Sequence, residues 1–140
     1  MQNPGPAHWE AAKQVISYLG STKDLWLTFG GKGGPQLEGY CNAHWGSQQH
    51  QHSISSFNFC YSQGSVSWSL KKQAIITLLS TEAEYIAEIH ASKEGIWLKS
   101  FIKEITRHDV GALTIKADNQ GAIALAKDNK FYTQTKHIDI

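Results

Sequence analysis

The sequence predicts an α/β protein whose sheet is mixed. Residues 36–70 hold three segments in which apolar and polar residues alternate, a pattern typical of half-buried strands. Residues 80–105 then repeat apolar residues at helical spacing, and a short strand pattern followed by a second helix occupies residues 112–127. Because a helix precedes the last strand, that strand most simply runs parallel to an earlier one, whereas the first three can pair antiparallel.

The composition indicates one ordinary folded domain. The chain has 140 residues, 41% of them hydrophobic and 11% aromatic, which is enough for a core. Its formal net charge is only +1, so binding to nucleic acid must be local or be supplied by attached domains. Two cysteines without paired spacing, no leader and no long apolar run predict an intracellular protein, cytoplasmic or nuclear, without a membrane partner.

An N-terminal segment, residues 1–35, is expected to stand apart from the domain at residues 36–140. Residues 7–19 have apolar residues at helical spacing between Pro6 and Gly20. "LWLTF", residues 25–29, alternates as a strand does, and "GGKGGP" after it is typical of a joint.

The domain itself is predicted to contain four strands and two helices. The first three strands are "QLEGYCNA", "SISSFNFCY" and "SVSWSL", and the turn "SQG" joins the second to the third as a hairpin. Phe57, Phe59 and Tyr61 share one face of the second strand. The long helix begins near Ser80, and "ALTIKA" and "NQGAIALAK" give the fourth strand and the last helix.

Three polar residues fall where these elements can bring them together. Asp118 follows the fourth strand, Glu84 lies about one turn into the long helix, and Asn42 stands near the end of the first strand. If the first and fourth strands are neighbours, the three converge at one sheet edge, where ligands of α/β proteins usually bind. Three carboxylates there would suit two divalent ions that cleave a phosphodiester, but only two of the three residues are acids.

Several segments, in order along the chain, resemble the ribonuclease H domain in the Pol polyprotein of copia-type retrotransposons. They are "GYCNAHW", "SVSWSLKKQ", "LLSTEAEYIAEIHASKEGIWL", "IKADNQGAIALAKDNKF" and "TQTKHIDI". The segment "NPGPAHWEAAKQVISYLGSTKDLWLTF" resembles the connection that follows the reverse transcriptase in the same polyproteins. The resemblance covers nearly the whole chain.

The resemblance implies a ribonuclease H-like fold that hydrolyses the RNA of RNA/DNA hybrids with two Mg²⁺ (or Mn²⁺) ions, beside the reverse-transcriptase domain of the same polyprotein. It assigns the catalytic and metal-ligand positions to Glu84, Asp118 and Asn42. Family members usually have Asp where this chain has Asn42 and His44. The family's domain also continues into a fifth strand and a helix that brings another Asp, so we expect a C-terminally truncated domain, a degenerate site and weak metal binding.

Each site residue also has a structural interpretation. Glu84 could pair with Thr81 in a capping box, and Asp118 with Asn119 could simply cap a helix. Asn42 could be a plain hydrogen-bonding residue at a strand end, because a neutral amide is a poor ligand for a hard divalent ion.

The remaining candidates concern zinc and nucleic acid. Cys41, His44, His50 and His52 have zinc-ligand types, but strand alternation places Cys41 and His44 on opposite faces. Trp45 beside the predicted cleft is a candidate for base stacking. Phosphates of a hybrid could be bound by four basic residues, although scattered surface lysines are common: Lys71, Lys72, Lys136 and His137.

Two functional classes therefore stay open. One is a ribonuclease H-type nuclease domain with an impaired catalytic set, and the other is a non-catalytic nucleic-acid-binding or assembly module. We also expect an exposed sheet edge at residues 113–118, which invites self-association unless the terminal "TKHIDI" folds back over it.

Overall fold

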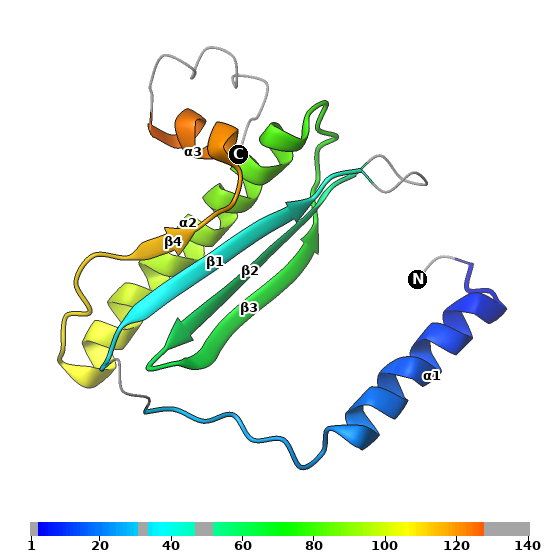
Figure 1. Cartoon of the computed structure of the whole chain (residues 1–140), viewed down its shortest axis with the longest axis horizontal. Coiled ribbons are helices and arrows are strands. Elements are labelled where there is room, and N and C mark those ends of the chain that lie inside the picture. The colour runs from blue at the N-terminus through cyan, green and yellow to red at the C-terminus, as the bar shows by residue number, and fades with distance from the viewer. Residues whose placement is uncertain (1–2, 31–33, 47–51, 128–140) are drawn as a thin grey trace.

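The structure is a computed structural model that describes residues 3–30, 34–46 and 52–127, and it has the predicted mixed α/β fold (Figure 1). Four strands form one sheet in the order β3-β2-β1-β4. The elements in chain order are α1 (Pro6–Ser21), β1 (Leu37–His44), β2 (Ile54–Tyr61), β3 (Gly64–Lys72), α2 (Ser80–Thr106), β4 (Thr114–Lys116) and α3 (Gln120–Lys127).

The sheet pairing confirms the antiparallel meander and the parallel fourth strand. β1 pairs antiparallel with β2 from Leu37↔Tyr61 to His44↔Ile54, and β2 pairs antiparallel with β3. Ser62 and Gln63 have positive φ values of 48° and 67°, as expected in a tight hairpin turn between right-twisted strands. β4 is shorter than expected and pairs parallel with β1 only from Glu38↔Thr114 to Tyr40↔Lys116.

The core lies between α2 and one face of the sheet. Phe59 is fully buried, and Phe57 and Tyr61 pack against the same cluster, which confirms the apolar face predicted for β2. A Cβ atom at Gly39 would overlap the Phe59 ring, and one at Gly95 of α2 would overlap Leu113 and touch the same ring. These two glycines therefore allow α2 and β1 to approach Phe59 closely.

No described element covers the other face of the sheet. Val66, Trp68 and Leu70 share a face of β3, as their spacing predicts, but they are 36%, 70% and 77% exposed. Alternation in β3 therefore gives an apolar stripe on the open face rather than a side of the core.

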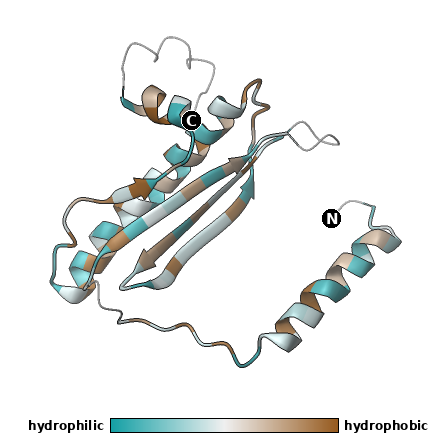
Figure 2. Ribbon diagram, viewed as in Figure 1, coloured by the Kyte–Doolittle hydropathy of each residue, from teal (hydrophilic) through white to brown (hydrophobic). Residues whose placement is uncertain are grey.

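The N-terminal segment stands apart from the sheet. α1 has no buried residue and contacts no other described helix or strand, although it carries hydrophobic residues along its length (Figure 2). The prediction of a strand at residues 25–29 is wrong, because these residues have no strand beside them with which to pair. Gly30 N donates to Ser62 O (3.1 Å), and the Phe29 ring lies where a side chain at Gly64 would stand.

Glycines shape the joint between the N-terminal segment and the sheet. Gly30 and Gly34 have φ values of 94° and 71°, a backbone conformation suited to glycine, at the joint predicted there. The domain boundary after residue 35 stays a prediction.

Within the described residues, no helix combines the length and the apolar character needed to cross a membrane.

Candidate active site

Glu84 reaches the end of β1 from the start of α2. Its Oε2 atom accepts a hydrogen bond from the backbone N–H of Ala43 (2.8 Å). The pairing of β1 with β4 ends at Tyr40, so the Ala43 N–H has no partner in β4 and is satisfied by the Glu84 carboxylate. Glu84 thus belongs to the sheet edge at which β1 and β4 separate.

The capping interpretation of Glu84 is wrong. α2 begins at Ser80, and Glu82 is the acid in its first turn; its Oε2 atom accepts a hydrogen bond from Leu78 N (3.0 Å). The contact of Glu84 lies 41 residues away along the chain, at Ala43. Sequence patterns within one helix could not reveal this contact.

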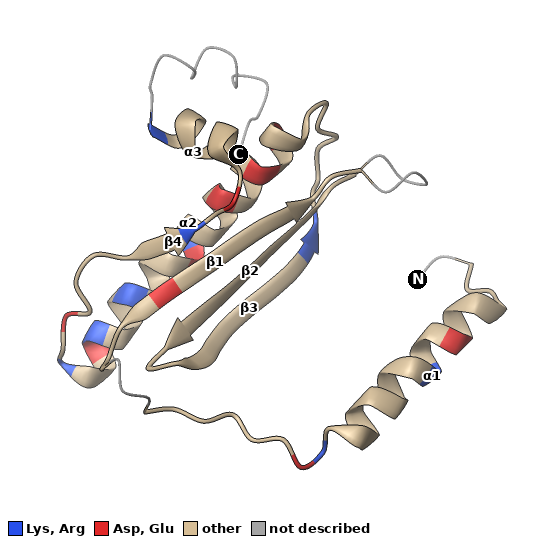
Figure 3. Cartoon of the chain, in the orientation of Figure 1, with Lys and Arg blue, Asp and Glu red and all other residues tan. Residues whose placement is uncertain are grey.

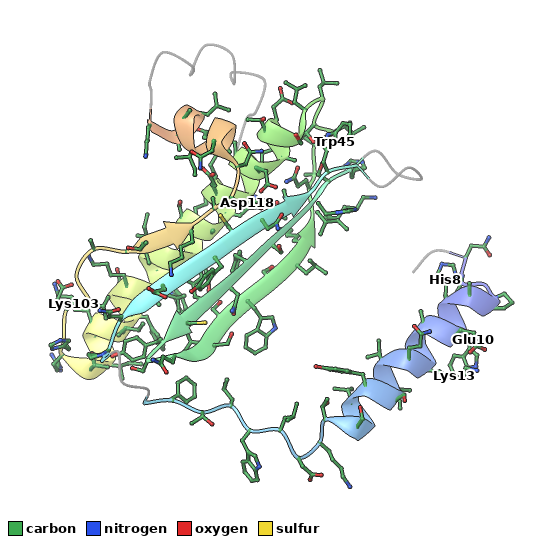
Figure 4. The ribbon with its side chains drawn as sticks, in the orientation of Figure 1. His8, Glu10, Lys13, Trp45, Lys103 and Asp118 are labelled. Carbon is green, nitrogen blue, oxygen red and sulfur yellow. The ribbon has the colours of Figure 1, made fainter. Side chains whose placement is uncertain are left out.

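Asp118 lies just after β4, on the way to α3 (Figure 4). Asn119 provides the helix cap, since its Oδ1 atom accepts a hydrogen bond from Ala122 N (3.0 Å). The capping role predicted as an alternative for this pair therefore belongs to Asn119. The exposed Asp118 carboxylate remains available for a ligand.

Asn42 and Asp118 line the same open cavity on the uncovered face of the sheet. The cavity has a volume of about 460 Å³, and Tyr40 and Lys116 line it as well. Lys116 Nζ donates hydrogen bonds to Tyr40 Oη and to Glu38 Oε2, each at 3.3 Å. The bond to Tyr40 and, to a smaller extent, the bond to Glu38 raise the pKa of Lys116. Asn42 and Asp118 thus share one cavity, and Glu84 contacts the same end of β1 through the Ala43 N–H, whereas the convergence of all three side chains on one ion stays a prediction. We call Asn42, Glu84 and Asp118 the acid edge.

The carboxylates near this edge act on one another. Burial raises the pKa of Glu84, the Ala43 N–H opposes the rise, and the charge of Asp118 adds to it. Cys41, buried beside them on β1, has its pKa raised to about 11 by burial and by Glu88, Glu84 and Asp118. Figure 3 shows acidic residues gathered at the start of α2 and at the end of β4.

Glu88 is a member of this cluster that the sequence analysis missed. Burial raises the pKa of Glu88, and the negative charge of Glu84 adds a smaller rise. The Oε1 atom of Glu88 is buried and has no hydrogen-bond partner among the described residues. The signal was available, because residues four apart on a helix lie on the same face. Glu84 and Glu88 therefore form one acidic stripe that faces Cys41.

A buried polar network holds α2 beneath the acid edge. Gln73 Nε2 donates to Ser55 Oγ (2.8 Å) and to the carbonyl oxygen of Ala83 (2.9 Å). Ser53 Oγ and Thr77 Oγ1 are 2.9 Å apart and share a hydrogen bond. These contacts fix the first turn of α2, and hence Glu84, against the ends of β2 and β3.

The edge has the oxygen ligands that Mg²⁺ and Mn²⁺ prefer, but it falls short of a set for two ions. Glu84 and Asp118 offer carboxylates, whereas Asn42 offers a neutral amide. Within residues 3–30, 34–46 and 52–127, no three His, Cys, Asp or Glu side chains form a group that could hold a metal ion. Cys41 is buried and His44 lies exposed on the opposite face of β1, so the two do not form a pair of zinc ligands.

The predicted nucleic-acid-binding residues are spread over several places. Trp45 is 51% exposed, and its Nε1 atom donates to Thr77 O (3.3 Å), which fixes it beside the acid edge (Figure 4). Lys71 points to the side of the sheet that α2 covers, and Lys72 alternates to the open face. Lys136, His137 and the histidine at position 50 lie outside the described residues.

Known proteins resemble this chain in sequence. It is 40% identical over 141 residues to a retrovirus-related Pol polyprotein from the transposon TNT 1-94 of Nicotiana tabacum, covering 100% of the chain and 10% of that protein. It is 31% identical over 139 residues to the Pol polyprotein from transposon RE2 of Arabidopsis thaliana, covering 99% of the chain and 10% of that protein. The chain thus spans about a tenth of the length of these polyproteins.

A shorter relative and a solved structure complete the comparisons. The chain is 42% identical over 97 residues to secreted RxLR effector protein 161 of Plasmopara viticola, covering 69% of the chain and 68% of that protein. No protein-family model matches. A crystal structure of Ciona intestinalis endonuclease V (D234N) with a 23mer DNA aligns weakly, with a TM-score of 0.32 and 10% identity over 66% of this chain and 40% of that one.

Proposed function

Because this chain is 40% and 31% identical, over nearly its whole length, to parts of two retrovirus-related Pol polyproteins of transposons, we propose that it is a ribonuclease H-like nuclease domain whose catalytic set is impaired. The ancestral reaction is the hydrolysis of RNA in an RNA/DNA hybrid, and the reverse-transcriptase domain of the same polyprotein is the proposed neighbour. The observation that carries the proposal is the meeting of Glu84 and Asp118 where β1 and β4 separate.

The residues of the acid edge have distinct roles in this proposal. Glu84 and Asp118 would hold Mg²⁺ or Mn²⁺, which when bound activates a water and stabilises the leaving oxygen of the phosphodiester. The Ala43 N–H orients the Glu84 carboxylate, leaving its other oxygen to face a ligand. Trp45 and Tyr40, both more than 40% exposed, would contact the hybrid beside the cavity.

Asn42 is the reason for the impairment. The exchange of a carboxylate for an amide removes one negative charge from a site that must offset divalent cations. Glu84 and Asp118 alone are expected to bind the metal weakly, so cleavage should be near background at millimolar Mg²⁺.

The test is an assay of a labelled RNA/DNA hybrid with Mg²⁺ or Mn²⁺. We expect Asn42→Asp to raise the cleavage rate about 100-fold, because even groups that only orient metal ligands change activity roughly 10–100-fold. In that background Glu84→Gln or Asp118→Asn should abolish the gain. Glu104→Gln is the matched control, since it makes the same change at an exposed position on the last turn of α2.

Two further measurements distinguish weak metal binding at Asn42 from the lack of a ligand that lies outside this sequence. Mn²⁺ affinity, measured by calorimetry, should rise with Asn42→Asp even if turnover does not. The same variants in a chain extended by the following segment of the tobacco relative show whether a ligand from outside this sequence is also needed. Robust cleavage by the unmodified chain that is lost on Asp118→Asn would contradict the role given to Asn42.

A non-catalytic nucleic-acid-binding module is the second candidate function. The neutral Asn42 in the cavity and the exposed Trp45, three residues further along the chain, favour it, because they can contact a strand without the charges that cleavage requires. Hybrid binding that weakens on Trp45→Ala, together with no cleavage after Asn42→Asp and extension, would favour this function over the first.

A further inference from the structure

A second cavity lies between α2 and the outer strand β3, and none of the three acid-edge residues lines it. Its volume is about 170 Å³, and three of the side chains around it are basic while none is acidic. The lining residues come from β2, β3 and α2: Ser55, Phe57, Ser69, Lys71, His90 and Lys93.

The fold itself brings these basic groups together. Lys71 is paired with Ser55 across β3 and β2, and both side chains face α2. His90 and Lys93 stand three residues apart on α2, so they share one side of the helix. Glu94, the next residue, accepts a hydrogen bond from Ser67 Oγ (2.7 Å) and does not line the cavity.

The charges around the cavity are not neutralised by acids. Within the part of the chain that the structure describes, neither Lys71 nor Lys93 forms an ion pair. Burial lowers the pKa of His90, and the charges of Lys71 and Lys93 lower it further. Like charges grouped at a half-buried cavity disfavour one another, and an anion placed among them would reverse that effect.

Neutral hydrogen-bond donors complete the lining. Gln73 Nε2 donates to Ser55 Oγ, so the Ser55 hydroxyl proton remains free to donate to a ligand. Ser69 adds a second hydroxyl to the same cavity. Two ammonium groups, an imidazole and two hydroxyls form a set of donors that suits a small oxyanion.

We propose that this cavity binds a phosphate group through Lys71, Lys93 and His90, with Ser55 and Ser69 as neutral donors. The phosphate is either a free anion or part of a nucleic-acid backbone. The site contains none of the acid-edge residues and requires no cleavage, so the proposal stands whether or not the nuclease function does.

The first experiment uses sulfate as the probe on the full chain, because its charge stays constant over the pH range in which histidine titrates. NMR of the His90 ring should show that saturating sulfate raises its pKa. Sulfate affinity should therefore rise as the pH falls through the lowered pKa of His90. Lys71→Gln and Lys93→Gln should each weaken sulfate binding about tenfold, the loss expected for one charge-assisted hydrogen bond.

Lys99→Gln is the control, since it removes the same charge from a half-exposed position on α2 that does not line the cavity. It should change sulfate affinity less than twofold, and each variant's thermal unfolding is compared to verify folding. An equal effect of all three variants would assign the binding to net charge and overturn the site. An unchanged His90 titration in saturating sulfate would overturn it as well.

The second experiment identifies the source of the phosphate. A single-stranded oligonucleotide is titrated at several salt concentrations against the same variants. If Lys71→Gln weakens oligonucleotide binding and reduces the salt slope by about one, the site takes a backbone phosphate. If only sulfate and inorganic phosphate binding are weakened, it takes a free anion.

Discussion

At the scale of single residues, Glu88 has a carboxyl group whose burial is poorly compensated. Its carboxyl group stands beside Glu84 and Cys41, and one of its oxygens is buried without a partner among the described residues. Because burial raises its pKa, the folded state holds the Glu88 proton more tightly than the unfolded state does. Between the ordinary value of 4.5 and the raised pKa, the free energy of unfolding therefore falls as the pH rises.

We predict that Glu88→Gln raises the melting temperature at pH 7, because the amide has no charge to bury. The difference from the unmodified chain should shrink as the pH falls from the raised pKa towards 4.5, below which both side chains are neutral. Thermal unfolding monitored by circular dichroism from pH 3.5 to 8 measures this. Glu104→Gln should show no such pH-dependent gain, and a Glu88→Gln effect that is constant with pH would contradict the explanation.

Residue types at the acid edge could be predicted from the sequence, but their partners could not. The ends of two strands and the start of a helix suffice to place Asn42, Glu84 and Asp118 at the same end of the sheet. The bond from the Ala43 N–H to Glu84 depends on where β4 stops pairing, which no local pattern encodes. Glu88 was missed because an acid one turn further along a helix usually faces solvent.

At the scale of elements, β1 and α2 pack closely because Gly39 and Gly95 lack side chains and so leave room for the Phe59 ring. The strand pattern of β1 includes Gly39 at a buried position, where glycine usually weakens a strand. Its presence is explained by the fully buried Phe59 ring, which occupies the place of the missing side chain.

We predict that Gly39→Ala lowers the free energy of unfolding by about 1–3 kcal/mol, the usual effect of overpacking a core. The Phe59 ring is rigid and enclosed, so it cannot move aside easily. Urea denaturation provides the measurement. Gly20→Ala is the control: nothing lies within 4 Å of a Cβ there, and alanine is favoured within a helix, so it should not destabilise α1.

The elements show where alternation fails as a predictor. β1, β2 and α2 were predicted nearly to their ends, since each buries one face against another element. β3 was predicted as well, although its apolar face stays open. Residues 25–29 alternate equally well yet form no strand, because a strand also needs a neighbour with free backbone groups. Periodicity records which face is apolar and carries no information on whether a partner strand is available.

At the scale of the whole molecule, the sheet has two edges of unequal length within the described residues. β4 pairs over three residues and carries Lys116, whereas β3 runs for nine residues beside the apolar stripe of Val66, Trp68 and Leu70. The sequence predicts self-association at residues 113–118. The structure favours β3 as the edge that pairs more readily with another chain, because a long edge strand with exposed apolar side chains is the better template for pairing.

We predict that the chain self-associates at high concentration and that Leu70→Lys reduces this association several-fold more than Thr114→Lys does. Both substitutions add one exposed positive charge, the first on β3 and the second on β4. Sedimentation velocity over a range of concentrations measures the effect. A stronger effect of Thr114→Lys would restore β4 as the main edge of contact.

The buried thiol of Cys41 has a consequence for chemical labelling. With its pKa raised to about 11, only about one molecule in a thousand carries the reactive thiolate at pH 8, and the native fold also shields the sulfur. In a Cys60→Ser background, iodoacetamide should therefore modify Cys41 only in molecules whose α2 has separated from β1, and added urea should accelerate the reaction in step with unfolding. Rapid labelling of the native chain, insensitive to urea, would contradict this. The rate of Cys41 alkylation then measures how often α2 separates from β1 at the acid edge, and the measurement requires neither substrate nor metal.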